Sequence, residues 1–164
     1  MHAAEGGHRI RAALPSEAPL LSALAMRAKA HWGYDREFLE RVRPLLTFSA
    51  ADLEAGPTFV LERAGVAVGV SRIVGAPPEG ELSDLWIEPS LIGRGFGRAM
   101  LRHAGAFAAE RGFASLLIKS DPFAEGFYLA MGAVRIGEAP AGSGRNLPLL
   151  RIAVTAPGSA RDSD

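Results

Sequence analysis

The spacing of apolar residues divides the chain into helical and strand-like segments. In one stretch the apolar residues recur three or four positions apart and predict a helix: Leu20, Leu21, Leu24, Ala25 and Ala28. With Gly and Pro as boundaries, the same criterion predicts four helices, at residues 16–30, 35–43, 97–111 and 123–131. Ser16 and Asp121 are the expected N-caps of the first and the last of these helices. Short apolar runs predict seven strands, at residues 8–14, 58–63, 66–76, 82–87, 114–119, 134–138 and 147–154.

The order of these elements indicates a mixed sheet. The strands at 58–63 and 66–76 are joined at Ala64-Gly65 and form an antiparallel hairpin. A strand at 82–87, a helix and a strand at 114–119 imply a right-handed crossover and a parallel pair. In an open sheet, ligands bind at the carboxyl ends of parallel strands, so we expect the site where the strand at 82–87 ends.

A glycine loop occupies that position. Every second residue lacks a Cβ, because Gly93, Gly95 and Gly97 alternate with Arg94, Phe96 and Arg98. Such a backbone can turn several N–H groups toward one point, beside the positive end of a helix dipole and two guanidinium groups. The loop therefore predicts an anion site, and phosphate is the anion that fits best.

The spacing excludes two common phosphate loops. A Rossmann fingerprint requires glycine where this chain has Arg98. A P-loop requires a Gly-Lys pair followed by Ser or Thr, and neither Gly93 nor Gly95 has such a pair at the required distance.

The composition limits the other possibilities. The 164 residues are the length of one domain, with 8–154 as its expected extent and with 1–7 and 155–164 expected to be disordered. The 18 basic and 18 acidic side chains cancel, so we expect neither nucleic-acid nor membrane binding. The chain has no cysteine, and its four histidines lack the spacing of a metal pair, so no metal site is expected. Without a membrane segment or signal peptide, a cytoplasmic location is expected.

A second motif, further along the chain, helps to identify the glycine loop. Phe127-Tyr128 lies three residues before Met131-Gly132, in the predicted helix after the parallel strand. Together with a strand, Pro89, a G-x-G-x-G loop and a helix, this pair resembles the GNAT superfamily of acyl-CoA N-acyltransferases over residues 8–154. The resemblance implies a three-layer α/β (α+β) fold. Its sheet would be seven-stranded and mostly antiparallel, with a central parallel pair and four flanking helices.

The resemblance also assigns roles to residues. The loop from Gly93 to Arg98 would bind the pyrophosphate of acetyl-CoA, and the backbone of Leu85, Trp86 and Ile87 would pair with its pantetheine arm. Tyr128 would be the general acid that protonates the departing thiolate. The chain departs from the family pattern twice, with Ile92 where Gln or Arg is usual and Phe123 where many members have Asn.

The acceptor side leaves alternatives open. Glu81 and Asp84 are candidate general bases, but their different parity places them on opposite faces of a regular strand, and ordered water is a third option. His31 is a weaker candidate base, or a cation that ends the first helix. Trp32 and Tyr34 either pack the two helices onto the sheet or form an aromatic wall of the acceptor site.

The function implied by the resemblance is transfer of acetyl from acetyl-CoA to a primary amine by direct attack. The acceptor would be a small-molecule or peptide amine, which the sequence does not specify. The alternative is a non-catalytic acyl-CoA-binding or sensor domain, and the resemblance is compatible with a homodimer.

Overall fold

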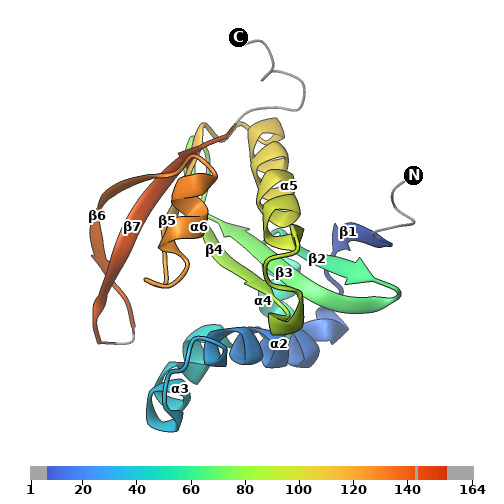
Figure 1. Cartoon of the computed structure of the whole chain (residues 1–164). Helices are drawn as coiled ribbons and strands as arrows, with labels where there is room; N and C mark the ends of the chain where they lie inside the picture. Colours follow the sequence, from blue (N-terminus) through green and yellow to red (C-terminus); the bar gives the residue numbers. More distant parts are fainter. Residues whose placement is uncertain (1–6, 143, 155–164) are drawn as a thin grey trace. The chain divides into compact units, whose positions relative to one another are not determined.

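The computed structural model describes residues 7–142 and 144–154, which form a seven-stranded sheet in the order β1-β2-β3-β4-β5-β7-β6 (Figure 1). The register pairs β1 with β2, β2 with β3, β5 with β7 and β6 with β7 as antiparallel strands, and β4 with β5 as parallel strands. The mixed sheet with one parallel pair is therefore confirmed. The strands are β1 (His8–Ala12), β2 (Thr58–Arg63), β3 (Val66–Val74), β4 (Glu79–Ile87), β5 (Ser115–Lys119), β6 (Val134–Pro140) and β7 (Asn146–Ala153). The disorder expected at 1–7 and 155–164 falls, except for Gly7, outside the described residues.

The described residues contain five α-helices, one more than predicted: α2 (Ala18–Ala30), α3 (Arg36–Val42), α4 (Ala50–Ala55), α5 (Phe96–Glu110) and α6 (Glu125–Ala130). The additional helix, α4, is too short for an apolar periodicity to reveal it. Its signal is a capping box, in which the Ser49 hydroxyl accepts from the Asp52 N–H at 3.0 Å and the Asp52 carboxylate accepts from the Ser49 N–H at 2.8 Å.

The start of α2 differs from the prediction that Ser16 caps it. A 3-10 turn at Pro15–Glu17 precedes the helix, which begins at Ala18. The Glu17 carboxylate accepts the Leu14 N–H at 2.8 Å and also pairs with Arg11 at 2.7 Å. Glu17 therefore provides the side-chain contact at this turn, and the role predicted for Ser16 is wrong.

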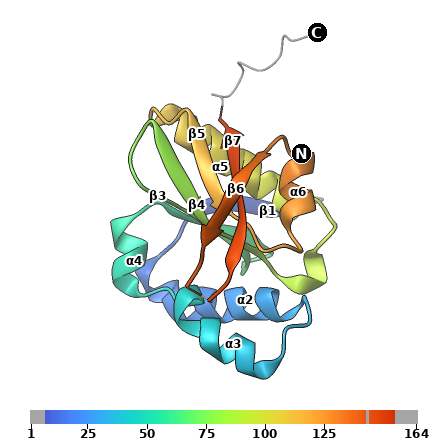
Figure 2. The ribbon, with the colours of Figure 1, turned by 90° about the vertical axis from the view of Figure 1, so that its left-hand side faces the viewer.

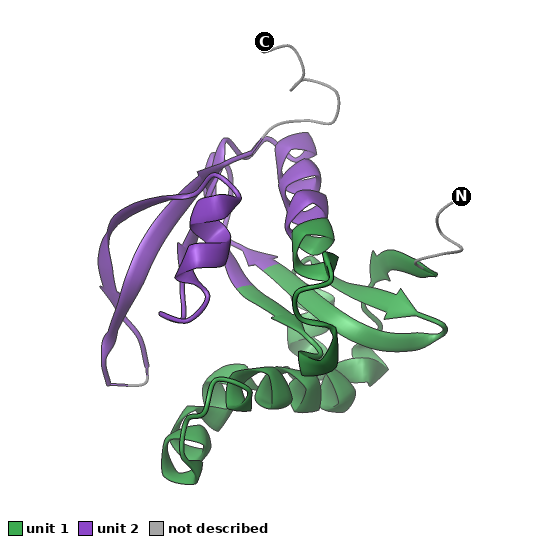
Figure 3. Cartoon of the chain, viewed as in Figure 1, with its two compact units in different colours: residues 1–72, 84–100 green, residues 73–83, 101–164 purple. Residues whose placement is uncertain are grey.

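The chain forms two compact units, which share β3, β4 and α5 (Figure 3). Unit 1 contains residues 1–72 and 84–100, and unit 2 contains residues 73–83 and 101–164. In unit 1, α2 packs on the sheet through a cluster that includes Leu21, Leu24, Val60 and Val70. A second cluster joins the start of α5 to the sheet and contains Leu61, Val68, Leu91, Phe96 and Met100.

Unit 2 contains β5, β7 and β6, which run side by side in Figure 2. The buried side chains of Leu116, Ile118 and Leu150 form part of its core. The Glu79 carboxylate accepts from Arg151 Nε and from Ser115 Oγ, both at 2.6 Å, so one acid bonds to side chains of two other strands. No helix in the described part of the chain is both long and apolar enough to cross a membrane.

Candidate active site

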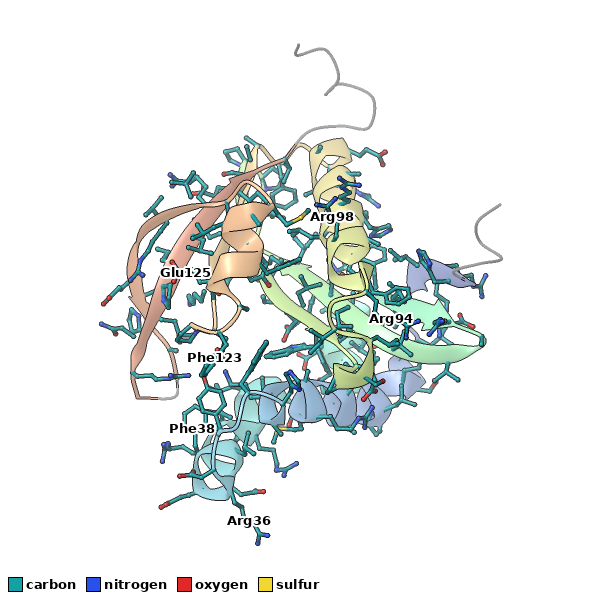
Figure 4. All side chains as sticks on the ribbon, viewed as in Figure 1. Arg36, Phe38, Arg94, Arg98, Phe123 and Glu125 are labelled. Atoms are coloured by element: carbon teal, nitrogen blue, oxygen red, sulfur yellow. The ribbon has the colours of Figure 1, made fainter. Side chains whose placement is uncertain are left out.

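The glycine loop has the backbone geometry of an anion cradle. Gly93 has φ +85° and Gly95 has φ +90°, a region that L side chains rarely adopt. A Cβ placed on either glycine would meet no atom within 4 Å, so both face open space. Arg94 lies beside the loop in Figure 4, and Arg98 lies further along α5. A phosphate can therefore approach this backbone closely.

Buried side chains fix the two ends of the loop. Leu91 and Phe96 are each 7% exposed and belong to the cluster under α5. The Phe96 ring also makes an edge contact with His8, at 5.4 Å between ring centroids, and the Arg63 guanidinium lies 5.5 Å from the ring centre. The loop between these anchors is exposed, which suits a segment that contacts a ligand through its backbone.

The first turn of α5 adds donors and positive potential. The first described bond that closes this turn runs from the Ala99 N–H to the Gly95 carbonyl at 3.1 Å. As at the start of any α-helix, the earlier N–H groups have no acceptor within the helix, and the dipole favours an anion there. Arg94 and Arg98 are exposed and form no ion pair among the described residues, so their charges add to this potential.

The side chains of β4 alternate between the two clusters of unit 1. Trp86 packs with the cluster of α2, whereas Leu85 and Ile87 pack with the cluster of α5. The backbone N–H and C=O groups of successive residues in a strand also point alternately to one side and the other. Those of Glu88 face β3, because the Glu88 N–H bonds to the Val68 carbonyl at 2.8 Å. In a regular strand the backbone groups of Ile87 and Leu85 then point away from β3.

The parallel pairing with β5 involves the first part of β4. Glu81 lies opposite Leu117, and β5 ends two residues later, at Lys119. The paired residues are Glu79–Glu81 of β4 and Ser115–Leu117 of β5.

The two candidate bases have different surroundings. Asp84 is half-buried and accepts a hydrogen bond from the Trp86 indole Nε1 at 3.0 Å. The two residues are two positions apart on the strand, so their side chains share one face. Glu81 is also half-buried and lies in the unit 2 part of β4, within the parallel ladder. The opposite parity predicted for the pair puts them on different faces of a regular strand.

Two aromatic pairs lie at the turn between α2 and α3 and in the first residues of α3. The His31 and Trp32 rings meet edge to face at 4.8 Å, and the Tyr34 and Phe38 rings stack at 4.5 Å. Lys29, which is only 7% exposed, places its Nζ 4.9 Å from the centre of the Tyr34 ring. A cation of the chain itself thus already lies at Tyr34, which argues against a substrate cation binding to that ring.

Tyr128 lies on α6 in unit 2 and is 7% exposed. Its ring contacts Phe127 at 5.1 Å, and its carbonyl accepts the N–H of Ala133 at 3.0 Å. Asp121, expected to cap this helix, instead accepts the Phe123 N–H at 2.8 Å in the turn before it, because α6 begins only at Glu125.

The two departures from the family pattern are apolar side chains at the surface. Ile92 is 40% exposed and Phe123 is 57% exposed. Neither side chain can offer a polar contact to a cofactor. Among the described residues no group of three or more His, Asp or Glu side chains is arranged to hold a metal ion.

Sequence reasoning missed three side chains in this region. Arg27 forms a two-point ion pair with Glu88, immediately before the glycine loop. The Lys29 ammonium lies near the Tyr34 ring and the Phe38 ring, and the Phe38 ring stacks on the Tyr34 ring. A signal existed for Lys29, which is four residues after Ala25 and therefore falls on the buried face of α2. No local pattern links Arg27 to an acid 61 positions away.

Comparisons with known proteins agree with this geometry. Solved structures with the same fold include one from Rhodopseudomonas palustris described as a GCN5-related N-acetyltransferase, with TM-score 0.75 and 19% identity over 89% of this chain and 95% of that one. The PaiA N-acetyltransferase of Thermoplasma acidophilum, solved with coenzyme A, has TM-score 0.73 and 15% identity over 89% and 98%. The ribosomal-protein-S18-alanine N-acetyltransferase of Escherichia coli has TM-score 0.67 and 17% identity over 95% and 99%.

No curated protein matches the chain by sequence. The model of the acetyltransferase (GNAT) family, however, matches residues 20–133. This match contains the glycine loop, β4 and the Phe127-Tyr128 pair. The chain belongs to the GNAT family of acetyltransferases.

Proposed function

We propose that the chain transfers an acetyl group from acetyl-CoA to a primary amine, with the loop 93–98 as the pyrophosphate site. The observation that carries the proposal is the pair of glycines, Gly93 and Gly95, with positive φ and open space at the start of α5. Acetyl-CoA supplies the acetyl group as an activated thioester. The loop would bind its pyrophosphate mainly through backbone N–H groups, with Arg94 and Arg98 adding charge.

The pantetheine arm would pair with β4. In a regular strand the backbone groups of Leu85 and Ile87 would point away from β3, and both residues lie beyond Glu81, where the pairing of β4 with β5 ends. A pantetheine amide can take the place of the missing strand. This divides the three predicted residues, because Leu85 and Ile87 would make the backbone contacts whereas the backbone groups of Trp86 would face β3.

Tyr128 would donate the proton that the thiolate takes up when the carbon–sulfur bond breaks. Its phenol is the acid, and its burial on α6 keeps the side chain in a fixed position. The amine nitrogen forms the new bond to the acetyl carbon and gives up a proton to a base. The thiol and the acetylated amine are the products.

The base remains a choice between two carboxylates and ordered water. Asp84 already accepts the Trp86 indole N–H, and this contact holds its carboxylate in place on β4. Glu81 lies earlier on β4 and would act from the other face of the strand. His31 is exposed at the end of α2 and is the weakest of the candidates.

The acceptor would be a small-molecule or peptide amine that lies against His31 and Trp32. The Escherichia coli neighbour acts on an alanine of a ribosomal protein, which provides one precedent for a peptide amine. Tyr34 is the weaker part of this wall because Phe38 and Lys29 already contact it.

The test combines calorimetry with an assay of thiol release against a panel of amines. We expect the wild type to bind coenzyme A and to release thiol, and we expect Tyr128→Phe to lower kcat by roughly 10²- to 10⁴-fold. Tyr34→Phe is the matched control, because it removes the other of the two phenols in the chain. Survival of turnover within a factor of about two in Tyr128→Phe would exclude the general acid assignment. Binding without turnover on any amine would favour the non-catalytic acyl-CoA-binding alternative.

A further inference from the structure

An ion pair joins α2 to the residue that follows β4. Arg27 donates from Nε to one Glu88 carboxylate oxygen at 2.9 Å and from a terminal nitrogen to the other oxygen at 2.7 Å. This two-point contact fixes both the distance and the orientation of the two groups. The Glu88 side chain is 23% exposed and the Arg27 side chain is 52% exposed.

The backbone of Glu88 is part of the entrance to the loop. Its N–H bonds to the Val68 carbonyl at 2.8 Å, and its own carbonyl accepts the Leu91 N–H at 2.9 Å. Leu91 is buried in the cluster under α5. Glu88 therefore occupies a fixed place, five residues before Gly93.

The position of Glu88 creates an electrostatic problem. It is the acid nearest in sequence to a loop that has no acidic residue of its own and carries Arg94 and Arg98. An uncompensated carboxylate at the entrance would repel a phosphate group, and over short distances salt would screen only part of that repulsion. Arg27 binds both oxygens of this carboxylate and so neutralises the charge without adding an acid or base to the loop.

We propose that Arg27 is a positioning residue for the donor substrate, which masks the Glu88 charge at the entrance of the anion loop. This inference rests on the proposed function, because it takes the anion to be the pyrophosphate of acetyl-CoA. Arg27 would act in donor binding and not in the chemical step. Its removal should therefore change KM for acetyl-CoA and leave kcat unchanged.

Three variants separate masking of charge from a general structural role. In Arg27→Gln the bare carboxylate should raise KM for acetyl-CoA about three- to tenfold, with kcat within a factor of about two of the wild type. Glu88→Gln has nearly the same shape without the charge, and its KM should equal or fall below that of the wild type. The double variant, Arg27→Gln with Glu88→Gln, should return KM to within about twofold of the wild-type value.

The chain offers a matched control in Arg43→Gln. Arg43 makes the same kind of two-point contact with Glu40, at 3.1 and 2.8 Å, on the surface of α3 and away from the loop in sequence. Arg43→Gln should leave KM for acetyl-CoA unchanged. The KM difference between Arg27→Gln and the wild type should also shrink when the salt concentration rises from about 0.05 to 0.5 M.

Each outcome supports or overturns the inference. A KM for Arg27→Gln equal to that of Arg43→Gln overturns it, as does a double variant no better than Arg27→Gln alone. If Arg27→Gln fails to fold, Glu88→Gln still decides, because a KM raised well above that of the wild type contradicts masking. Failure of the wild type to bind coenzyme A would instead refute the proposed function, so the two failures are distinguishable.

Discussion

The change Gly95→Ala tests whether the glycine loop is the donor site or an ordinary connection between a strand and a helix. Gly95 has φ +90°, and a Cβ added there would meet no atom within 4 Å. The change therefore causes backbone strain but no collision with the protein. Any collision must come from a ligand. Gly65, in the turn between β2 and β3, is a matched control because it has φ +79° and the same open surroundings.

The expected magnitude follows from these two angles. A non-glycine residue in the left-handed region costs about 1–2 kcal/mol, so both variants should lose a similar free energy of unfolding. If the loop of Gly95→Ala relaxes this strain by changing its conformation, coenzyme A binding must restore the strained conformation. A cost of about 1–2 kcal/mol corresponds to a roughly 5- to 30-fold weaker affinity. A methyl group that points at the phosphate would weaken it further.

Calorimetry with coenzyme A and urea unfolding measure both quantities. We expect Gly95→Ala and Gly65→Ala to unfold at similar urea concentrations, and only Gly95→Ala to bind coenzyme A more weakly. Equal affinity in the two variants and the wild type would refute the assignment of the loop. An equal loss of affinity in both would show that general stability, and not contact with the cofactor, controls binding.

Two predictions concern stability. The Ser71 side chain is fully buried and its hydroxyl has no hydrogen-bond partner among the described residues. Ser71→Ala should therefore raise the free energy of unfolding by about 1 kcal/mol in urea titrations. A lower free energy of unfolding in this variant would show that the hydroxyl has a partner. The hydrogen bonds from Arg11 lower the pKa values of Glu17 and Glu62. This stabilisation is present above the unfolded pKa of about 4.3 and is lost as the pH falls through the lower folded values. Between pH 7 and pH 3, Arg11→Gln should therefore lose less stability than the wild type. Arg9→Gln is the control, because Arg9 is mostly exposed and lies farther, at 3.4 Å, from Glu62.

The backbone of the site could be predicted from the sequence because its signals are local. Gly93, Gly95 and Pro89 define the end of a strand and the start of a helix within a few residues, and the structure has β4 and α5 at those places. The capping box at Ser49 is an equally local signal, but the six residues of α4 are too few to show the apolar periodicity by which a helix is predicted. Element boundaries near proline were less accurate, as the 3-10 turn at Pro15–Glu17 shows.

Side-chain partners across long sequence distances could not be predicted. Arg27 pairs with Glu88, and the choice among many acids and bases of the chain depends on how α2 lies across the end of β4. A sequence pattern gives the face of a helix but not its angle or register on a sheet, and a shift of one turn would bring a different residue to Glu88.

The turn with His31, Trp32 and Tyr34 is a second example of this limit. Its residue types leave two interpretations open for Trp32 and Tyr34: packing of the two helices onto the sheet, or contact with the substrate. The structure separates them by geometry: Phe38 stacks on Tyr34 and the Lys29 ammonium lies near the ring, whereas His31 is exposed. Because a ring that already has a cation nearby gains little from a second one, the packing interpretation is favoured for Tyr34. Under the proposed function, Trp32 is then the aromatic residue of this turn that would contact the amine.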